Sequence, residues 1–283
     1  MRIFRTIVII IFAACAGLYA GTGIWDKYKN DKTKPEIHTD EVVLDMSVSD
    51  PPKKQLQGLT AVDEKDGDLT DSIMVSGTSY FIEKGEVTVT YVVFDSDNNF
   101  GTLSRKVKYT DYHSPEFSLT QPLIFSRNSS VSFLDYIKAS DQLDGDLTDK
   151  VKMSGSNIDM TNAGVYPITL EVTNSCGDRT EIETNVVIQD SNPAGSILLN
   201  AYLVYIDKNS EFDAGDYIQS VVSSSGEQLQ TKGLWIYDGS SPLTEINVNG
   251  TVDTGAPGCY QLEYTYRTSR SEGSAWLTVV VRE

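Results

Sequence analysis

Two stretches of this sequence gather carboxylates around a glycine, and they carry its strongest chemical signal. The pattern Asp-x-x-Asp-Gly-Asp-Leu-Thr-Asp occurs at residues 63–71 and again at residues 141–149. Calcium takes about six to eight oxygen ligands, and clustered aspartates beside a glycine turn can supply several of them. The candidate calcium ligands are Asp63, Asp66, Asp68, Asp71, Asp141, Asp144, Asp146 and Asp149.

A structural interpretation of the same motif is also open. Neither stretch is an EF-hand loop, because no bidentate glutamate stands at its twelfth position. Aspartate side chains readily accept hydrogen bonds from nearby backbone N–H groups, and in the first motif they would cap a short helical turn at residues 69–73. Each motif therefore predicts either a calcium site or a hydrogen-bonded turn.

Aromatic side chains concentrate in the last third of the chain and indicate a binding surface there. Trp235 and Tyr237 fall on an expected strand that ends in a loop at residues 238–239, and exposed Trp and Tyr dominate recognition surfaces. We expect this pair to bind a protein or a glycan. The tyrosines of residues 260–266 share one face of a strand and are expected to fill a core instead.

The residue inventory offers little for catalysis. The chain has two histidines and three cysteines, and it lacks the common signatures of serine hydrolases, zinc proteases and phosphate-binding loops. Acidic pairs can hydrolyse glycosides, but such enzymes need a deep cleft that a small β-sandwich seldom provides. We therefore expect no enzyme. Cys176 and Cys259 are expected to be separate free thiols.

Composition excludes further classes of protein. With 40 acidic against 23 basic residues the net charge is −17, so a phosphate backbone would repel the chain and a nucleic-acid role is excluded. Three cysteines rule out a disulfide-stapled mini-protein and a cysteine-rich zinc site. The length suggests roughly two domains of ~150 residues each, or more if they are small.

The first 25 residues predict the compartment. Residues 6–25 carry no charge, and a helix of about twenty apolar residues matches the hydrocarbon core of a bilayer. Arg2 and Arg5 precede this segment, which favours a cytoplasmic N-terminus with the body of the chain outside. We expect a retained transmembrane anchor. Cleavage after Ala20, which would give a secreted protein, and lipidation at Cys15 are the alternatives.

An internal repeat sets the architecture of the rest. The sequence stays in register downstream of both acidic motifs, and a third, divergent copy follows that lacks the motif. Joints at Pro35, Pro115 and Pro193 precede the three copies. Because proline biases its predecessor to extended backbone, each joint ends one sheet without starting a helix. We expect three units joined into a semi-rigid rod.

Each copy has the periodicity of a β-sandwich. Apolar and polar residues alternate in the strands expected at residues 87–94, 166–173 and 260–267, which is typical of strands with one face in a core. Turn residues follow the first two of these strands, and a further strand closes each unit. Units of this length with six or seven short strands fit the immunoglobulin-like sandwich.

The first two copies resemble a known family. The acidic motifs, the strands after them and the exits at Asp111 and Asp190 are similar to the bacterial immunoglobulin-like repeats of the Cry22-like, or DUF5011, family. The resemblance covers residues 35–190, whereas the third copy matches only by pattern, through Gly258 and Tyr260. It implies immunoglobulin-like modules that lie outside the cell and serve as spacers, adhesive units or accessory domains without catalytic activity.

The expected fold is all-β, with three tandem immunoglobulin-like β-sandwiches after an N-terminal transmembrane helix. The expected boundaries are a signal anchor or signal peptide at 1–25, a linker at 26–34, and immunoglobulin-like domains at 35–113, 114–191 and 192–283.

The expected function is that of a non-catalytic bacterial cell-surface protein whose rod serves adhesion, spacing or docking. Its partner would be a protein or glycan of the cell envelope, bound by the distal domain. A carbohydrate-binding accessory protein and a self-associating subunit of a surface assembly are the alternatives. Calcium is the one cofactor that the sequence suggests.

Overall fold

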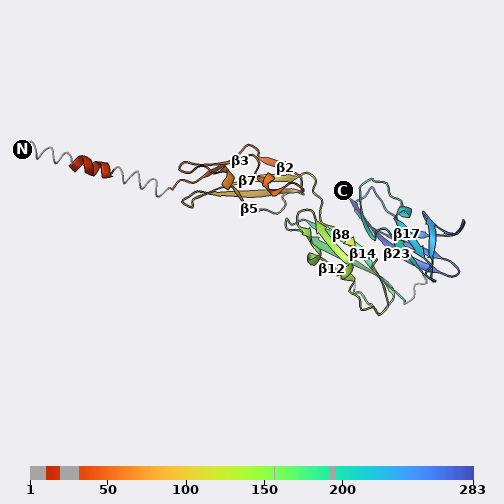
Figure 1. Ribbon diagram of the computed structural model, residues 1–283. Helices are drawn as coiled ribbons and strands as arrows, with labels where there is room; N and C mark the ends of the chain where they lie inside the picture. Colours follow the sequence, from red (N-terminus) through yellow and green to blue (C-terminus); the bar gives the residue numbers. More distant parts are fainter. Residues whose placement is uncertain (1–10, 20–31, 156, 191–194) are drawn as a thin grey trace, which may run out of the picture. The chain divides into compact units, whose positions relative to one another are not determined.

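The computed structural model describes residues 11–19, 32–155, 157–190 and 195–283 (Figure 1). Residues 11–19 form a helix. No helix in these ranges is both long enough and apolar enough to cross a membrane. The predicted apolar segment at residues 6–25 and the predicted linker at 26–34 lie partly outside the described residues, and the joint at Pro193 lies wholly outside them.

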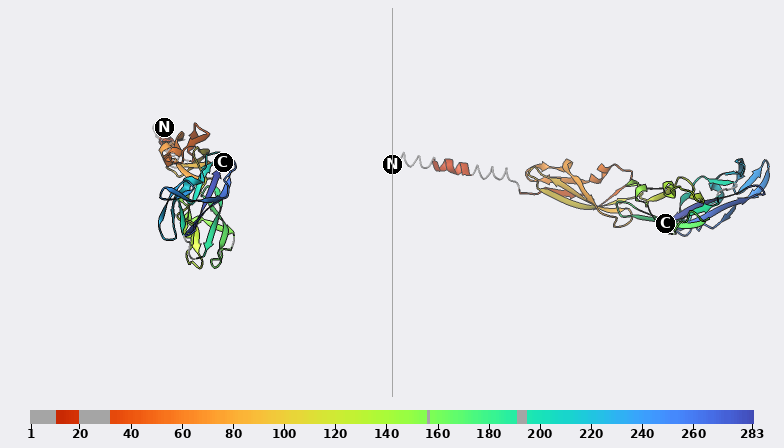
Figure 2. Two further views of the ribbon diagram at one scale, coloured as in Figure 1. Left: turned by 90° about the vertical axis from the view of Figure 1, so that its right-hand side faces the viewer. Right: turned by 90° about the horizontal axis from the view of Figure 1, so that it is seen from below.

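The expectation of an all-β chain is confirmed for the body of the protein. The strands of the described residues form six sheets, which pair into three β-sandwiches. The chain divides into two compact units: Met1–Tyr112 holds the first sandwich, and His113–Glu283 holds the second and the third. Long strands run through each sandwich (Figure 2).

The first sandwich stacks a three-stranded sheet on a four-stranded one. In sheet order the first sheet contains β1 (Glu36–Thr39), β3 (Leu59–Asp63) and β4 (Gly67–Asp68). The second contains β2 (Val43–Met46), β7 (Phe100–Tyr109), β6 (Glu86–Phe94) and β5 (Met74–Thr78). Two 3-10 helices, η1 (Pro52–Leu56) and η2 (Thr70–Ser72), complete it.

The second sandwich repeats this plan. Its three-stranded sheet contains β11 (Gly145–Asp146), β10 (Ile137–Asp141) and β8 (Glu116–Leu119). Its four-stranded sheet contains β12 (Lys152–Gly155), β13 (Gly164–Thr173), β14 (Arg179–Gln189) and β9 (Ile124–Ser126). The 3-10 helices are η3 (Phe133–Tyr136) and η4 (Thr148–Lys150).

The third sandwich enlarges one of the two sheets. Its five-stranded sheet contains β15 (Ser196–Leu199), β17 (Ile218–Val222), β18 (Gln228–Lys232), β19 (Trp235–Asp238) and β20 (Ser241–Glu245). Its four-stranded sheet contains β16 (Leu203–Asp207), β23 (Glu272–Arg282), β22 (Gly258–Arg267) and β21 (Asn247–Asn249). One 3-10 helix, η5 (Ala214–Tyr217), precedes β17.

Alternation along the central hairpins explains the three cores. In β6 every second side chain is fully buried while its neighbours reach the surface, because successive residues of a strand point to opposite faces of the sheet. The same alternation buries Tyr264 and Tyr266 in β22, so the predicted core role of these tyrosines is confirmed.

The second and third sandwiches share an apolar seam. The outer face of the sheet that contains β16, β22 and β23 packs against the core of the second sandwich. Leu203 belongs to that core cluster, and Tyr205, Cys259 and Val280 pack against it. The third sandwich therefore covers part of the core of the second, and unit His113–Glu283 is more than two modules joined at their ends.

Polar contacts fix the same seam. The backbone N–H of Phe117, on the edge strand β8, donates to the Tyr205 hydroxyl at 2.8 Å. The buried hydroxyls of Thr184 and Thr278 lie 2.8 Å apart, and the Arg282 guanidinium pairs with Glu116 at 2.6 Å. Burial raises the pKa of Tyr205, so its hydroxyl stays neutral.

Candidate functional site

The first acidic motif forms a tight hydrogen-bonded turn between β3 and β4. The buried Asp63 carboxylate accepts the backbone N–H groups of Lys65 at 2.8 Å and Asp66 at 3.0 Å. Asp68 accepts the N–H of Thr70 at 2.9 Å, which orients the start of η2. Gly67 has a φ of +75°, a conformation that glycine adopts without steric cost. Asp63, Gly67 and Asp68 thus each have a local structural role.

The second motif reproduces this geometry residue by residue. Asp141 accepts the N–H groups of Leu143 and Asp144 at 2.9 and 3.0 Å, and Asp146 accepts the N–H of Thr148 at 2.9 Å. Gly145 has a φ of +74°. The repeated pattern therefore encodes a repeated turn.

The same turn also holds the tip of the central hairpin. In the first sandwich, Asp66 accepts both the N–H and the hydroxyl of Ser96, at 2.8 and 2.9 Å. In the second, Asp144 accepts the equivalent groups of Ser175, at 2.7 and 2.6 Å. The motif thus ties the two sheets of a sandwich together at one end.

The structure favours the hydrogen-bonded turn over the calcium site. Within the described ranges, no group of three or more His, Cys, Asp or Glu residues could hold a metal ion. Calcium at the motifs stays a prediction, which thermal unfolding of the full chain with calcium and with chelator tests. A midpoint that rises with calcium would support it.

One difference separates the two turns. Asp141 accepts a hydrogen bond from Asn174 at 3.3 Å, and both side chains are buried. The position of Asn174 in the hairpin is occupied in the first sandwich by Asp95, which is buried as well. Two buried carboxylates, Asp63 and Asp95, therefore stand where the second sandwich has a hydrogen-bonded acid–amide pair.

The aromatic pair lies on the outer face of the five-stranded sheet. Trp235 is 43% exposed and Tyr237 is half-buried, while Ile236 between them points into the core. Cross-strand neighbours supply polar groups: Lys232 and Glu245 flank Trp235, and Gln230 stands opposite Tyr237. Leu243 on β20 is also exposed. We call Trp235, Tyr237 and Leu243 the aromatic face.

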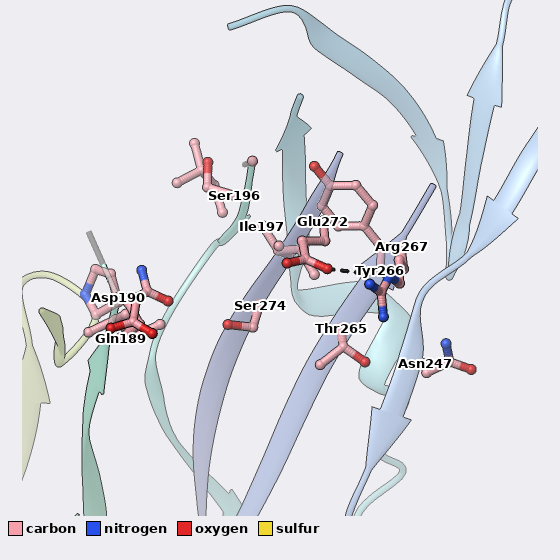
Figure 3. Close-up of a pocket in the computed structure, with 15 residues that line it drawn as sticks. Gln189, Asp190, Ser196, Ile197, Asn247, Thr265, Tyr266, Arg267, Glu272 and Ser274 are labelled. Atoms are coloured by element: carbon pink, nitrogen blue, oxygen red, sulfur yellow. Dashed lines mark ion pairs between the residues drawn. The ribbon is translucent and has the colours of Figure 1, made fainter. Parts of the chain in front are cut away.

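A cavity that the sequence did not indicate lies between the second and third sandwiches (Figure 3). Its volume is about 600 Å³, and it opens to solvent. Figure 3 shows side chains from β14 on one side and from β22 and β23 on the other. The polar lining includes Gln189, Asp190, Asn247, Thr265, Ser274 and the ion pair Arg267–Glu272.

The lining of this cavity offers hydroxyl, amide and paired charged groups, which can hydrogen-bond a polar molecule. No sequence pattern indicated this cavity, because its two walls come from different copies of the repeat. The predicted free thiols are confirmed, since Cys176 and Cys259 are both unpaired. The aromatic face and the acidic motifs do not converge on one site: the former lies in the third sandwich, and the latter lie in the first and second.

Comparison with known proteins supports a bacterial immunoglobulin-like repeat. Residues 133–188, within the second sandwich, match the family model of the bacterial surface protein Ig-like domain. The pesticidal crystal protein Cry22Aa of Bacillus thuringiensis is 30% identical over 161 residues, which cover 55% of this chain and 22% of that protein. The resemblance to bacterial Ig-like repeats is thus supported, whereas the DUF5011 assignment and the number of copies stay predictions.

Two further similarities are more distant. An 81.3 kDa protein of Acholeplasma phage L2 is 24% identical over 203 residues, covering 69% of this chain and 25% of that protein. The chain thus spans about a quarter of the length of the curated relatives it matches. A solved structure of the CBM51-2 and INT domains of Clostridium perfringens ZmpB, in complex with GlcNAc, has 18% identity and a TM-score of 0.23. It covers 53% of this chain and 26% of that one, and a likeness this low says nothing about function.

Proposed function

We propose that this chain is a non-catalytic bacterial surface protein that docks a partner of the cell envelope through its third sandwich. The observation that carries this proposal is the aromatic face, where Trp235 is 43% exposed on a sheet that does not take part in the seam. Large aromatic side chains are costly to leave in water and are enriched where proteins bind partners. The match to a bacterial surface Ig-like domain supports the location.

The third sandwich has two sheets with different tasks in this proposal. Its four-stranded sheet contacts the second sandwich through Tyr205 and Val280. Its five-stranded sheet stays available for a partner, with Trp235 at the centre of three paired strands. The seam thereby fixes the direction in which the aromatic face points relative to the second sandwich.

Crosslinking capture from native envelopes tests this proposal. The bait is the full chain, compared with W235A/Y237A. Removal of the third sandwich is unsuitable as a comparison, because it would uncover the core of the second. Tyr80→Ala is the matched control, since Tyr80 is 73% exposed and lies in the first sandwich. A partner captured by wild type and Y80A but lost from W235A/Y237A supports docking by the aromatic face, and equal capture by all three contradicts it.

Glycan binding is the second candidate for the same face. Two aromatic side chains at alternate positions of β19, with Gln230 and Lys232 beside them, can stack on sugar rings and hydrogen-bond their hydroxyls. A soluble-glycan panel distinguishes this role from protein docking. Binding that W235A/Y237A abolishes would favour a carbohydrate-binding accessory protein, and no binding to any glycan would favour a protein partner.

The membrane anchor remains part of the proposal. We propose that residues 6–25 are retained as a single-pass anchor with the body outside the cell, because the uncharged segment follows Arg2 and Arg5. N-terminal sequencing of the mature protein tests this. A native N-terminus in the membrane fraction supports the anchor, whereas a mature chain that begins after Ala20 or at a lipidated Cys15 contradicts it.

A further inference from the structure

The hairpin of β6 and β7 ends in two exposed aromatic rings. Phe94 is the last residue of β6, Phe100 is the first residue of β7, and the two pair across the strands. Their ring centroids lie 5.9 Å apart, and the residues are 45% and 50% exposed. Apolar surface of this kind is unfavourable in water, so this end of the first sandwich is a candidate contact surface.

The chain enters the first sandwich beside these rings. The Lys34 ammonium lies 5.8 Å from the centroid of the Phe100 ring. The carbonyl oxygen of Pro35 approaches Gly101 so closely that a Cβ at that position would collide with it. We call Lys34, Phe94 and Phe100 the entry face. It lies where the sequence that contains the uncharged segment at residues 6–25 joins the sandwich.

The outer face of the sheet changes character along β6 and β7. From the aromatic end onward, its cross-strand pairs are Val92–Thr102, Thr90–Ser104, Thr88–Lys106 and Glu86–Lys108. The Lys106 ammonium also pairs with the Glu86 carboxylate at 2.6 Å. At about 3.3 Å per residue, Glu86 lies roughly 26 Å along the strand from Phe94. The sheet is therefore apolar at the end where the chain enters and charged at the opposite end.

The other two sandwiches have charges where the first has its aromatic pair. The last pair before the hairpin loop is Thr173–Arg179 in the second sandwich and Arg267–Glu272 in the third. The fold therefore does not require aromatic rings at this place. Among the three hairpins, the aromatic pair occurs in the sandwich that follows the uncharged segment.

A short linker limits how far the entry face can lie from that segment. Eight residues, 26–33, separate residues 6–25 from Lys34, and a fully extended linker of this length spans at most about 30 Å. If residues 6–25 are an anchor in the bilayer, as proposed above, the entry face stays within that distance of the bilayer. Tethering gives a high effective concentration, so a small contact surface is sufficient.

The side chains of the entry face suit the boundary between headgroups and acyl chains. Aromatic rings are enriched at this depth of a bilayer. A lysine can lay its apolar stem along the acyl chains while its ammonium stays at the level of the lipid phosphates. Phe94, Phe100 and Lys34 therefore combine the apolar and cationic groups that this layer accommodates.

The carboxylates at this end do not prevent such a contact. Asp95 is buried and Asp97 pairs with Lys65. Glu36 and Glu64 are exposed and line an open cavity beside the entry face. Zwitterionic headgroups carry an ammonium as well as a phosphate, and opposite charges attract, so these headgroups can lie against both signs of charge.

We propose that the entry face lies in the headgroup layer of the bilayer that holds the chain's own anchor, with the rings of Phe94 and Phe100 against the acyl chains. The first sandwich is then held on the membrane by its entry end as well as by the linker. This inference rests on the proposed anchor at residues 6–25. It is independent of partner docking by the third sandwich, because the two surfaces lie on different sandwiches.

Photocrosslinking from the lipid tests the proposal. The full chain is reconstituted in phosphatidylcholine bilayers in which some lipids carry a diazirine on one acyl chain, and lipid adducts are located by mass spectrometry after trypsin digestion. Trypsin separates residues 85–105, which contain both rings, from residues 66–84. We expect adducts on residues 6–25 and 85–105. Residues 66–84 should stay free of them, although Tyr80 and Ile82 are 73% and 54% exposed before the charged end of β6.

The variant F94S/F100S removes both rings at exposed positions, so the fold is expected to remain. The adduct yield on residues 85–105 should fall at least about tenfold. The matched control is Y80S/I82S, which removes two exposed apolar side chains from the other end of the same sandwich. It should keep the yield of the wild type.

The same digest separates failure of this contact from failure of the anchor. Adducts on residues 6–25 without adducts on residues 85–105 would leave the anchor in place and overturn contact by the entry face. Equal yields on residues 66–84 and 85–105, or a yield that F94S/F100S leaves unchanged, would show non-specific contact and overturn it too. A lack of adducts on residues 6–25 would contradict the anchor, and the contact that rests on it.

Discussion

The acidic turns of the first and second sandwiches differ at one buried position, which is Asp95 in the first and Asn174 in the second. In the first sandwich the turn therefore contains two buried acids, Asp63 and Asp95. In the second sandwich the same positions hold Asp141 and Asn174, and the amide donates to the acid at 3.3 Å. A carboxylate at position 95 has no N–H to donate, so the first turn has no counterpart of the hydrogen bond from Asn174 to Asp141.

Exchanging the turn residues should add this hydrogen bond to the first turn. Asn99 donates its side-chain amide to Asp95 at 2.7 Å, and the residue equivalent to Asn99 in the second sandwich is Asp178. The double variant D95N/N99D therefore reproduces the second turn. We expect the free energy of unfolding of the first sandwich to rise by about 1 kcal/mol, measured by urea titration. The reverse exchange, N174D/D178N, should lower the stability of the second sandwich, and a stabilising effect would contradict the assignment.

The lowered pKa values of two further aspartates indicate how the stability of the first and second sandwiches depends on pH. Hydrogen bonds from the side chain and backbone of Thr70 lower the pKa of Asp68, and those of Thr148 lower the pKa of Asp146. The unfolded chain keeps the ordinary value of 3.8. A lowered native pKa stabilises the fold fully above the unfolded value, and this stabilisation is lost as pH falls through the native value.

We therefore expect both sandwiches to lose stability as pH falls below about 4. Urea unfolding of wild type and of D68N/D146N, at mildly acidic pH and at strongly acidic pH, checks this expectation. The variant has no carboxylate to protonate at these positions, so its stability should fall less over the same interval. An equal fall in both proteins would show that other carboxylates control the response.

For single residues, the sequence identified the acidic motifs but left their role open between calcium binding and a hydrogen-bonded turn. The acidic motifs could be found because Asp63 and Asp141 recur with the same neighbours. Whether those carboxylates face an ion or a backbone N–H depends on the turn geometry around Gly67 and Gly145. Spacing alone cannot distinguish the two, since both interpretations need clustered oxygens beside a glycine.

Strand β8 depends on a residue that is far away in the chain. It is an edge strand of the second sandwich, and its Phe117 N–H donates to Tyr205 of β16. The variant Y205F removes the acceptor and leaves a backbone donor without its partner, which typically costs about 1–3 kcal/mol. We expect unit His113–Glu283 to lose that much stability and the Phe117 amide to exchange with solvent faster.

The control for this variant is Y237F. Tyr237 lies on the opposite sheet of the third sandwich, away from the seam. Hydrogen exchange read at Phe117 should be the same in Y237F and wild type. If Y205F left that amide as protected as in wild type, the hydroxyl would have no part in holding β8.

The central hairpins were predictable as elements, and the seam was not. Alternation predicted strands at residues 87–94, 166–173 and 260–267, and the structure has β6, β13 and β22 there. Yet Val279, Val280 and Val281 form an unbroken apolar run in β23. A strand covered on both faces has such a run, so this run is a signal that the third sandwich packs against a neighbour.

At the scale of the whole molecule, we expect the second and third sandwiches to unfold together, because the third covers part of the core of the second. A chain that ends at Asp190 would lack Leu203, Tyr205 and Val280, which cover the core of the second sandwich. We expect its second sandwich to melt at a lower temperature and to bind a dye for exposed apolar surface. The first sandwich, in its own compact unit, should keep its midpoint. An unchanged midpoint for the second would show that it is complete by itself.

The fold class of the whole molecule followed from the sequence more readily than its grouping did. The repeat and the strand period indicated β-sandwiches, because both are local properties of the chain. The repeat predicts three units in series, whereas the structure groups the second and third into one compact unit. That grouping depends on side chains from strands about a hundred residues apart, such as Thr184 and Thr278, and no local pattern identifies which strand is the partner.

The seam also limits how such a chain can be recombined. Repeat proteins grow and diverge by duplication and exchange of modules, and a module can move only if it carries its whole core with it. A gene fusion made after Tyr112 would transfer a complete part. A fusion made after Asp190 would separate the core of the second sandwich from the side chains of the third that cover it. The second and third sandwiches are therefore a single cassette, to be inherited, transplanted or engineered as a pair.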